Sequence, residues 1–203
     1  MNKFENDPGT KNILPLDNNG EFDIDAYLEL LKLNINTNNE NINSCKDLLL
    51  ETIKSNGKII FCGNGGSFGI ASHLSCDFGK GLKRFYKNIR VVCLGCNQPL
   101  FTALSNDYGF ENALSSELEM LGIENDLLIA ISSSGRSLNI SNCIKQAKKQ
   151  KIKTIGLSGF DGGDLKQNSD IPIHFNVKNY PLVELLHQNF LDLLCLSLFK
   201  SKK

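Results

Sequence analysis

The chain has 203 residues, enough for one well-buried α/β domain, and a second full domain would be cramped. Its 22 basic residues balance its 22 acidic ones, so the overall charge gives no reason to expect nucleic acid or an anionic membrane as a partner. Apolar residues make up 41% of the sequence, which excludes wholesale disorder and is ordinary for a globular protein.

The first 21 residues predict a flexible extension, and residues 22–203 predict a single domain. Residues 1–20 are rich in Asn, Asp, Gly and Pro and contain no basic-then-apolar signal sequence, so we expect a cytoplasmic protein. Seven cysteines scattered through expected strands and helices fit reduced thiols better than disulfides. Cys93 and Cys96 form a C-x-x-C sequence, but no second pair accompanies them, and a redox or zinc role is the less favoured interpretation.

Helical patterns and short apolar runs alternate along the rest of the chain. Apolar residues at helical spacing predict two N-terminal helices, around 27–33 and 45–53. Short apolar runs predict buried strands at 58–62, 90–94, 127–131, 153–157 and 171–175. Further helices are expected at 68–78, 111–121, 138–149 and 182–199.

This alternation is typical of an α/β fold with a doubly wound, five-stranded parallel sheet and helices on both faces, a flavodoxin-like three-layer sandwich. Ligands of such sheets bind beyond the carboxyl ends of the strands, where the informative loops of this sequence fall. The apolar stretch at 182–199 is interrupted by several polar residues and predicts a long buried C-terminal helix, so we expect no membrane span.

A glycine-rich loop follows the first predicted strand. The residues Gly63-Asn64-Gly65-Gly66-Ser67 precede a predicted helix, and the glycines would let backbone N–H groups approach an anion at the helix amino terminus. A tight strand-to-helix turn would explain the same glycines, and this loop alone leaves the two interpretations about equal.

A serine-rich loop, Ser132-Ser133-Ser134-Gly135-Arg136-Ser137, occupies the equivalent position after the third strand. One of its serines is expected simply as a helix N-cap. Four serines within six residues are more than capping needs, and hydroxyls with helix amides can bind a phosphate without a lysine. The two loops together therefore predict a phosphate site formed by Asn64, Gly65, Gly66, Ser67, Ser132, Ser133, Ser134 and Ser137.

Polar and titratable residues recur at four-residue spacing on two of the predicted helices. His73 and Asp77 lie four residues apart after the glycine loop and could point into one site, although a histidine satisfied by the backbone is the simpler alternative. Glu184, Gln188 and Asp192 follow one another at every fourth position of the last helix. A functional row and a solvent-facing stripe are both open for these three side chains.

In these two loops and in further segments, the chain resembles the SIS superfamily, specifically the phosphoheptose isomerases and their relative, the DnaA initiator-associating protein. The resemblance covers roughly residues 27–199. Its marks are the two loops, the segment 102–109, and the segment 155–159 followed by Asp161-Gly162-Gly163. It implies that the serine loop grips a sugar phosphate and that Asn64, Ser67 and Asp107 contact the sugar chain.

The resemblance implies an aldose-ketose isomerase that interconverts sedoheptulose 7-phosphate and D-glycero-D-manno-heptose 7-phosphate through an enediol, for bacterial lipopolysaccharide or capsule. It further implies a homotetramer with active sites shared between subunits, and several family members carry zinc.

His73 matches a metal-binding histidine, and Asp77 takes the place of the catalytic glutamate. Glu184 takes the place of a metal-binding glutamine, and Asp192 that of a second acid–base histidine. The expected roles are therefore Asp77 and Asp192 as catalytic pair, Glu184 also as a substrate contact, and a site for Zn²⁺ or another divalent metal at His73, Asp77, Glu184 and Asp192.

Several of these positions depart from the family pattern. Asp77, Glu184 and Asp192 each differ from the family residue, and Pro181-Leu182 replaces an Asp-Arg pair that contacts the substrate. The alternative hypotheses are therefore a non-catalytic protein that binds a phosphosugar or a protein partner, and an isomerase of a different ketose phosphate.

Overall fold

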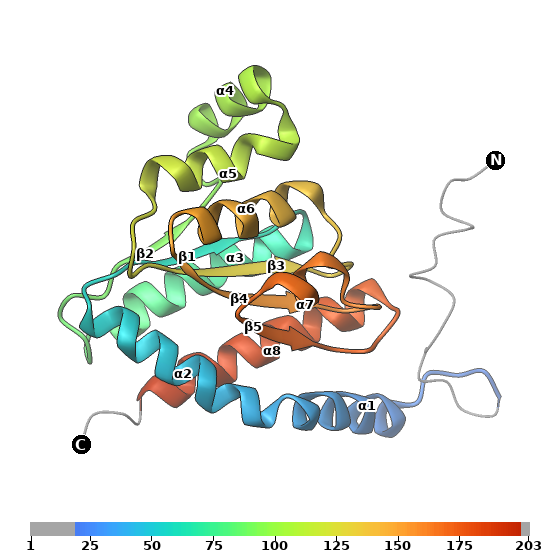
Figure 1. Ribbon diagram of the computed structural model, residues 1–203. Helices are drawn as coiled ribbons and strands as arrows, with labels where there is room; N and C mark the ends of the chain where they lie inside the picture. The colour runs from blue at the N-terminus through green and yellow to red at the C-terminus, as the bar shows by residue number, and fades with distance from the viewer. Residues whose placement is uncertain (1–18, 200–203) are drawn as a thin grey trace, which may run out of the picture.

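The computed structural model describes residues 19–199, so most of the predicted extension at 1–21 lies outside the described residues. Five parallel strands form one sheet in the order β2-β1-β3-β4-β5, with helices on both faces (Figure 1). The strands are β1 (Ile59–Cys62), β2 (Val91–Cys93), β3 (Leu127–Ser132), β4 (Lys153–Ser158) and β5 (Ile171–His174). This is the predicted doubly wound α/β sandwich, and the prediction of its fold is confirmed.

The helices divide into two layers and two outlying elements. They are α1 (Ile24–Thr37), α2 (Asn39–Lys54), α3 (Gly66–Cys76), α4 (Gln98–Tyr108), α5 (Phe110–Leu121), α6 (Leu138–Lys149), α7 (Gly163–Asn168) and α8 (Tyr180–Phe199). Figure 1 shows α5 and α6 over one face of the sheet and α2, α3 and α8 over the other. Leu165 of the short helix α7 packs in the same core cluster as α5 and α6. The helices α1 and α4 lie outside these layers, against α8 and α5 respectively.

The apolar runs that predict the strands form the centre of both cores. Every residue of β1 and of β3 is buried, as expected for a parallel sheet covered on both faces. Side chains alternate along each strand, so Phe61 packs under α3 and α8 whereas Ile60 packs under α5 and α6. Because β1 lies between β2 and β3, the chain runs outward in both directions from this point of the sheet. A sheet of this topology opens a crevice at the carboxyl ends of those neighbouring strands.

The long C-terminal helix α8 is a core element of the sandwich. Within residues 19–199 it is the one helix long and apolar enough, by length and composition, to cross a membrane. Half of its most apolar stretch is buried inside the molecule, where Leu186, Phe190 and Leu191 are fully enclosed. A buried helix of a sandwich core meets the same criteria of length and composition, and the expected buried helix is what the structure contains.

Three elements depart from the sequence expectations. The helix expected at 68–78 is α3 followed by a π-helical turn, Asp77–Gly81. The helix α4 was not expected, because Leu104 is its only buried residue and the apolar pattern is correspondingly weak. Asn97 caps this helix by accepting from the N–H of Leu100 at 3.3 Å. The short helix α7 begins directly at the paired glycines 162 and 163, which conceal it in the sequence.

All seven cysteines are free thiols, as the scattered spacing predicts. Burial raises the pKa of Cys45 to about 12, and burial is also the main cause of the raised pKa of Cys93. Thiols held protonated in this way are poor nucleophiles and poor metal ligands. Of the C-x-x-C pair, Cys93 is buried at the end of β2, whereas Cys96 is exposed in the turn that follows and its Sγ lies 3.8 Å from Oγ of Ser72.

Candidate functional site

The glycine loop and the serine loop lie side by side at the carboxyl edge of the sheet, because the strands that precede them are hydrogen-bonded neighbours. Together with the start of α8 they enclose a cavity of about 250 Å³. Its lining residues are Asn64, Gly65, Gly66, Ser67, Ser132, Ser133, Ser134, Ser137, Tyr180 and Glu184. Every residue predicted to contact the substrate is in this set except Asp107. Tyr180 was not predicted, since nothing in the sequence shows which side chains at the start of α8 face the loops.

The glycine loop leaves the amino terminus of α3 open to a ligand. Gly65 occupies the N-cap position with φ 51°, and no side chain caps the helix. A Cβ atom on Gly63 would lie 2.4 Å from the carbonyl oxygen of Ser67, so only glycine permits this tight turn. The first turn of α3 contains no acidic residue, and the positive end of the helix dipole therefore faces the cavity unopposed from within the helix.

The serine loop presents hydroxyl groups that capping does not consume. Ser137 is the N-cap residue of α6 but makes no side-chain cap bond, and its Oγ lies 3.1 Å from Oγ of Ser132 instead. The hydroxyl of Ser134 accepts from the N–H of Arg136 at 3.2 Å. The hydroxyl of Ser133 is buried and has no hydrogen-bond partner among residues 19–199. A buried hydroxyl without a partner is unusual, and a bound anion would supply the missing acceptor.

Both loops are held by contacts from the layer that contains α6 and α7. The amides of Asn64 and Asn139 exchange two hydrogen bonds, at 2.7 and 2.8 Å, which tie the glycine loop to α6. The segment at 161–163 supports the serine loop, since Arg136 forms an ion pair with Asp161 and Gly135 accepts from the N–H of Leu165 at 3.2 Å. The loops therefore present a preformed binding surface to a ligand.

The carboxylate of Glu184 reaches the cavity from α8. A Cβ atom on Gly66 would lie 2.3–2.5 Å from the carboxyl atoms of Glu184, so this side chain rests directly against the start of α3. Burial raises the pKa of Glu184 above its ordinary value. No hydrogen bond or ion pair joins the Glu184 side chain to any other residue in the described part of the chain.

The remaining predicted site residues lie outside this cavity. His73 Nε2 and Asp77 Oδ2 are 3.2 Å apart, as the four-residue spacing predicts, and their side chains are 62% and 49% exposed. Both oxygens of Asp192 accept from the amide of Gln188 at 3.1 Å. Asp107 is exposed near the end of α4, where it accepts from Asn106 at 2.9 Å.

The four predicted metal ligands do not come together within one chain. In the described residues, no group of three or more His, Cys, Asp or Glu side chains is arranged to hold a metal ion. Burial raises the pKa of Cys195 to about 12, with Asp77 and Asp192 as smaller contributors, so these two carboxylates lie near the same thiol. A zinc site thus does not fit the donor set of a single chain, and zinc stays a prediction that would require donors from a neighbouring copy.

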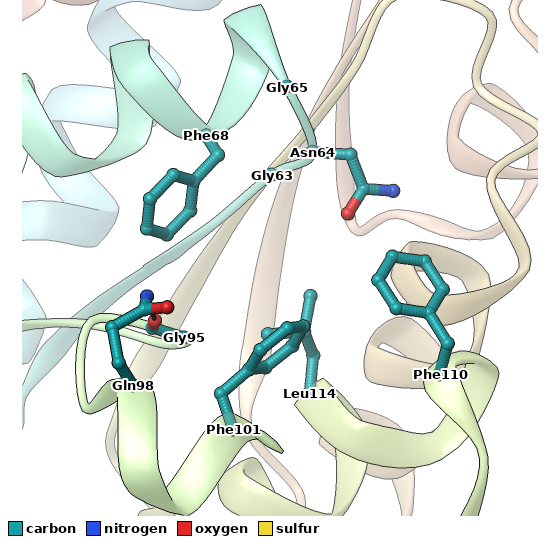
Figure 2. Close-up of a pocket in the computed structure, with 9 residues that line it drawn as sticks. All are labelled: Gly63, Asn64, Gly65, Phe68, Gly95, Gln98, Phe101, Phe110 and Leu114. Carbon is teal, nitrogen blue, oxygen red and sulfur yellow. Dashed lines mark hydrogen bonds between the residues drawn. The ribbon is translucent and has the colours of Figure 1, made fainter. Parts of the chain in front are cut away.

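A second, apolar cavity of about 240 Å³ also borders the glycine loop (Figure 2). Asn64 and Gly65 line both cavities, and the rings of Phe68, Phe101 and Phe110 point into the second one. The sequence did not indicate this cavity, because the apolar pattern of α4 is too weak to predict that helix. Phenyl rings offer no acceptors or donors to a phosphate, so the anion-binding geometry belongs to the serine-lined cavity.

The sequence and the fold are similar to those of known sugar-phosphate proteins. Residues 24–159 match the family described as SIS domain, and this is more than half of the chain. The chain is 34% identical to a phosphoheptose isomerase of Helicobacter pylori (strain ATCC 700392 / 26695) over 170 residues, which cover 84% of this chain and 88% of that protein. It is 33% identical to a phosphoheptose isomerase of Aliarcobacter butzleri (strain RM4018) over 170 residues, covering 84% and 90% of the two chains.

Two solved structures have the same fold over most of their length. A phosphoheptose isomerase from Neisseria gonorrhoeae superposes with a TM-score of 0.79 at 26% identity, covering 85% of this chain and 94% of that chain. A phosphoheptose isomerase from Francisella tularensis superposes with a TM-score of 0.77 at 26% identity, covering 86% and 95% of the two chains. Both matches span nearly the whole of the solved chains, so the fold is shared across the domain and not only in one part of it.

Proposed function

The chain belongs to the SIS-domain family and to its phosphoheptose isomerase group, and we propose that it interconverts sedoheptulose 7-phosphate and D-glycero-D-manno-heptose 7-phosphate. The observation that carries this proposal is the serine-lined cavity between the two loops, where the four hydroxyls of the serine loop meet two helix starts without side-chain caps. Such a cavity suits the phosphate of an open-chain sugar ester. The enzyme is accordingly an aldose-ketose isomerase that acts on a heptose phosphate.

The cavity would contribute to the reaction by fixing one end of a flexible substrate. Isomerisation moves a proton from C1 to C2 of the sugar through an enediol, and it needs a proton-transfer group and stabilisation of the enediolate oxygen. The serine hydroxyls and the amides at the start of α6 would bind the phosphate at C7. Binding energy gained at this remote group can then hold C1 and C2 in a reactive position.

The sequence-based assignment of Asp77 as base and Asp192 as acid would require more than the cavity of one chain, because neither residue lines it. A homotetramer with shared active sites would bring a second copy to the substrate. Exposed apolar side chains support such association, since α1 carries Ile24, Leu28 and Leu33 and α8 carries Leu193 and Leu196, all 40–64% exposed. The predicted zinc would have to be completed by donors of that second copy, and no step of the reaction is derived through it.

The cellular setting that we propose is the cytoplasm, where a soluble enzyme would supply heptose for lipopolysaccharide or capsule. The lack of any net charge supports a small-molecule substrate over nucleic acid or membrane as the main partner.

Two alternatives rest on specific residues. A non-catalytic phosphosugar-binding or regulatory role is favoured by the substitutions at Asp77, Glu184 and Asp192, which alter family acid–base and metal positions while the phosphate cavity is intact. A different ketose phosphate as substrate is favoured by Pro181-Leu182, which removes a charged substrate contact at the start of α8.

A single assay separates these possibilities. We expect sedoheptulose 7-phosphate incubated with the protein in D₂O to yield the aldose with deuterium at C2, as followed by NMR and mass spectrometry. A phosphosugar that raises the melting temperature without any exchange would favour the binding role instead. Exchange with a shorter ketose phosphate but not with the heptulose phosphate would favour the third possibility.

The double variant Ser133→Ala, Ser134→Ala is expected to weaken phosphosugar binding by about 1–3 kcal/mol, because it removes two hydroxyl donors from the phosphate. Isothermal titration calorimetry with the heptulose phosphate measures this loss, and inorganic phosphate should compete with the sugar in the native protein. Ser115→Ala is the matched control, since the Ser115 hydroxyl bonds to its own helix at 2.9 Å and lies outside the cavity. Affinity equal to that of the native protein in the double variant would place the phosphate elsewhere.

A further inference from the structure

We propose that Glu184 is the proton-transfer group for the sugar bound in its own chain, because its carboxylate lines the same cavity as the serine loop. This inference rests on the proposed isomerase function and goes beyond it, since the family resemblance gives this position to a metal ligand. Glu184 is the one carboxylate among the described residues that line the cavity.

The position of Glu184 suits contact with the uncharged part of the substrate. Its carboxylate comes from α8 and rests against Gly66 of the glycine loop, whereas the hydroxyls of Ser132, Ser133 and Ser134 come from the serine loop. Repulsion between a carboxylate and a phosphate dianion opposes their direct contact. The phosphate is therefore held on the serine side, and the carbon chain extends towards α8.

The side chain is also free to accept a proton from a substrate. Among residues 19–199 no donor or cation engages the Glu184 carboxylate. By contrast, Asp77 is paired with His73, and both oxygens of Asp192 are held by Gln188. Neither of these aspartates lines the cavity.

Within one chain, Glu184 lies apart from the other three predicted metal ligands. A metal ligand at 184 would need to gather with His73, Asp77 and Asp192, and no three such side chains in the described part of the chain do so. Glu184 instead lies two turns earlier along α8 than Asp192, at the level where α3 begins. Within one chain the Glu184 carboxylate is thus placed beside the phosphate cavity and apart from the other three residues.

The proton balance of the step closes without any further reactant. The carboxylate takes the proton from C1 of the ketose, and the electrons of that C–H bond form the C1–C2 double bond. The carbonyl electrons of C2 move to O2, which receives the hydroxyl proton of O1. The carboxylic acid then returns its proton to C2 while O1 forms the new carbonyl with C1, which regenerates the carboxylate.

Glu184→Gln tests the inference, because glutamine keeps the shape of the side chain and cannot accept the proton. We expect turnover and deuterium exchange to fall about 10²- to 10⁴-fold, the usual contribution of a general base, with little change in phosphosugar affinity. Glu184→Asp should recover part of the exchange, because it restores a carboxylate one methylene further from the substrate. Glu119→Gln is the matched control, since Glu119 is exposed on α5 and lies outside the cavity.

Each outcome separates this inference from the proposed function. Exchange by Glu184→Gln at close to the native rate, with exchange lost in Asp77→Asn, would overturn the role of Glu184 and leave the isomerase function standing. A lower zinc content in Glu184→Gln, together with recovery on added zinc, would also overturn it and restore the metal-ligand role. Absence of exchange in the native protein with every ketose phosphate would remove the isomerase function and this inference with it.

Discussion

Substitution of Gly135 by alanine is expected to destabilise the fold strongly and to abolish phosphosugar binding. Gly135 lies at the turn of the serine loop with φ 67°, a left-handed conformation that costs a residue with a Cβ atom about 1–2 kcal/mol. The added Cβ would also lie 2.0 Å from the carbonyl oxygen of Gly162. Forcing an extra carbon into such a packed contact typically costs about 1–3 kcal/mol more.

The loss of binding follows from the contacts between the serine loop and the chain at 162–165. Gly135 accepts a hydrogen bond from Leu165 and lies against the backbone at 162–163, so the clash can be relieved only by moving the serine loop. That movement would displace Ser133 and Ser134, the hydroxyls that face the cavity. Urea unfolding reports the stability, and calorimetric titration with the heptulose phosphate reports the binding.

Gly69→Ala provides the matched control for Gly135→Ala. Gly69 lies in α3, is exposed and has open space where the methyl group of alanine would lie, so alanine there should be neutral or stabilising by up to about 1 kcal/mol. An unchanged urea midpoint in Gly135→Ala would show that the serine loop does not depend on its contact with the segment at 161–163.

The positions of the strands along the chain and the position of the phosphate cavity could be predicted because each depends on local signals. Short apolar runs predict β1 and β3 wherever they pack, and the paired glycines and clustered serines follow those runs directly in the sequence. The topology rule for parallel sheets then brings the two loops together. Little long-range information was needed for this part of the site.

The roles of the titratable residues could not be predicted in the same way. A four-residue spacing does predict that His73 meets Asp77 and that Gln188 meets Asp192, and both contacts are present. Spacing within one helix does not predict the position at which that helix packs along its neighbour. The position of α8 along α3 decides that Glu184 reaches the cavity and that Asp192 does not. This position results from packing of the buried face of α8, which many apolar sequences satisfy equally well.

The buried imidazole of His187 is expected to make the protein lose stability between about pH 6.5 and pH 4. His187 is fully buried on α8 beside Phe175, and neither ring nitrogen has a hydrogen-bond partner of good geometry among residues 19–199. Burial lowers the pKa of His187 to about 4, an effect that the nearby backbone of Ser158 only partly offsets. An unfolded chain binds this proton below about pH 6.5, whereas the folded chain does not bind it until about pH 4.

The sign of the effect follows from that difference. Because the unfolded state binds more protons across this window, acidification favours unfolding, and the whole shift corresponds to about 3 kcal/mol. His187→Leu removes the titrating group at similar volume, so its urea midpoint should fall less than that of the native protein between pH 7 and pH 4.5. At pH 7 the variant should be as stable as the native protein or more so, since an imidazole without partners is replaced by an apolar side chain.

Comparison of the two proteins isolates His187 from the other groups that titrate in acid. Burial also lowers the pKa of His174. At Asp170, burial raises the pKa, but hydrogen bonds from Thr154 outweigh it and the net pKa is lowered. Acidification therefore destabilises the fold through His174 and Asp170 in the native protein and in the variant. Glu184, whose pKa burial raises, acts in the opposite direction in both. The contributions of Asp170 and Glu184 cancel in the difference between native and variant, because neither residue is changed or acts on His187. The charge of His174 itself helps to lower the pKa of His187, so this coupling belongs to the His187 effect that the comparison measures. Parallel pH curves would mean that water or a rearranged backbone satisfies the His187 ring, and the buried end of α8 would then be more polar than its packing indicates.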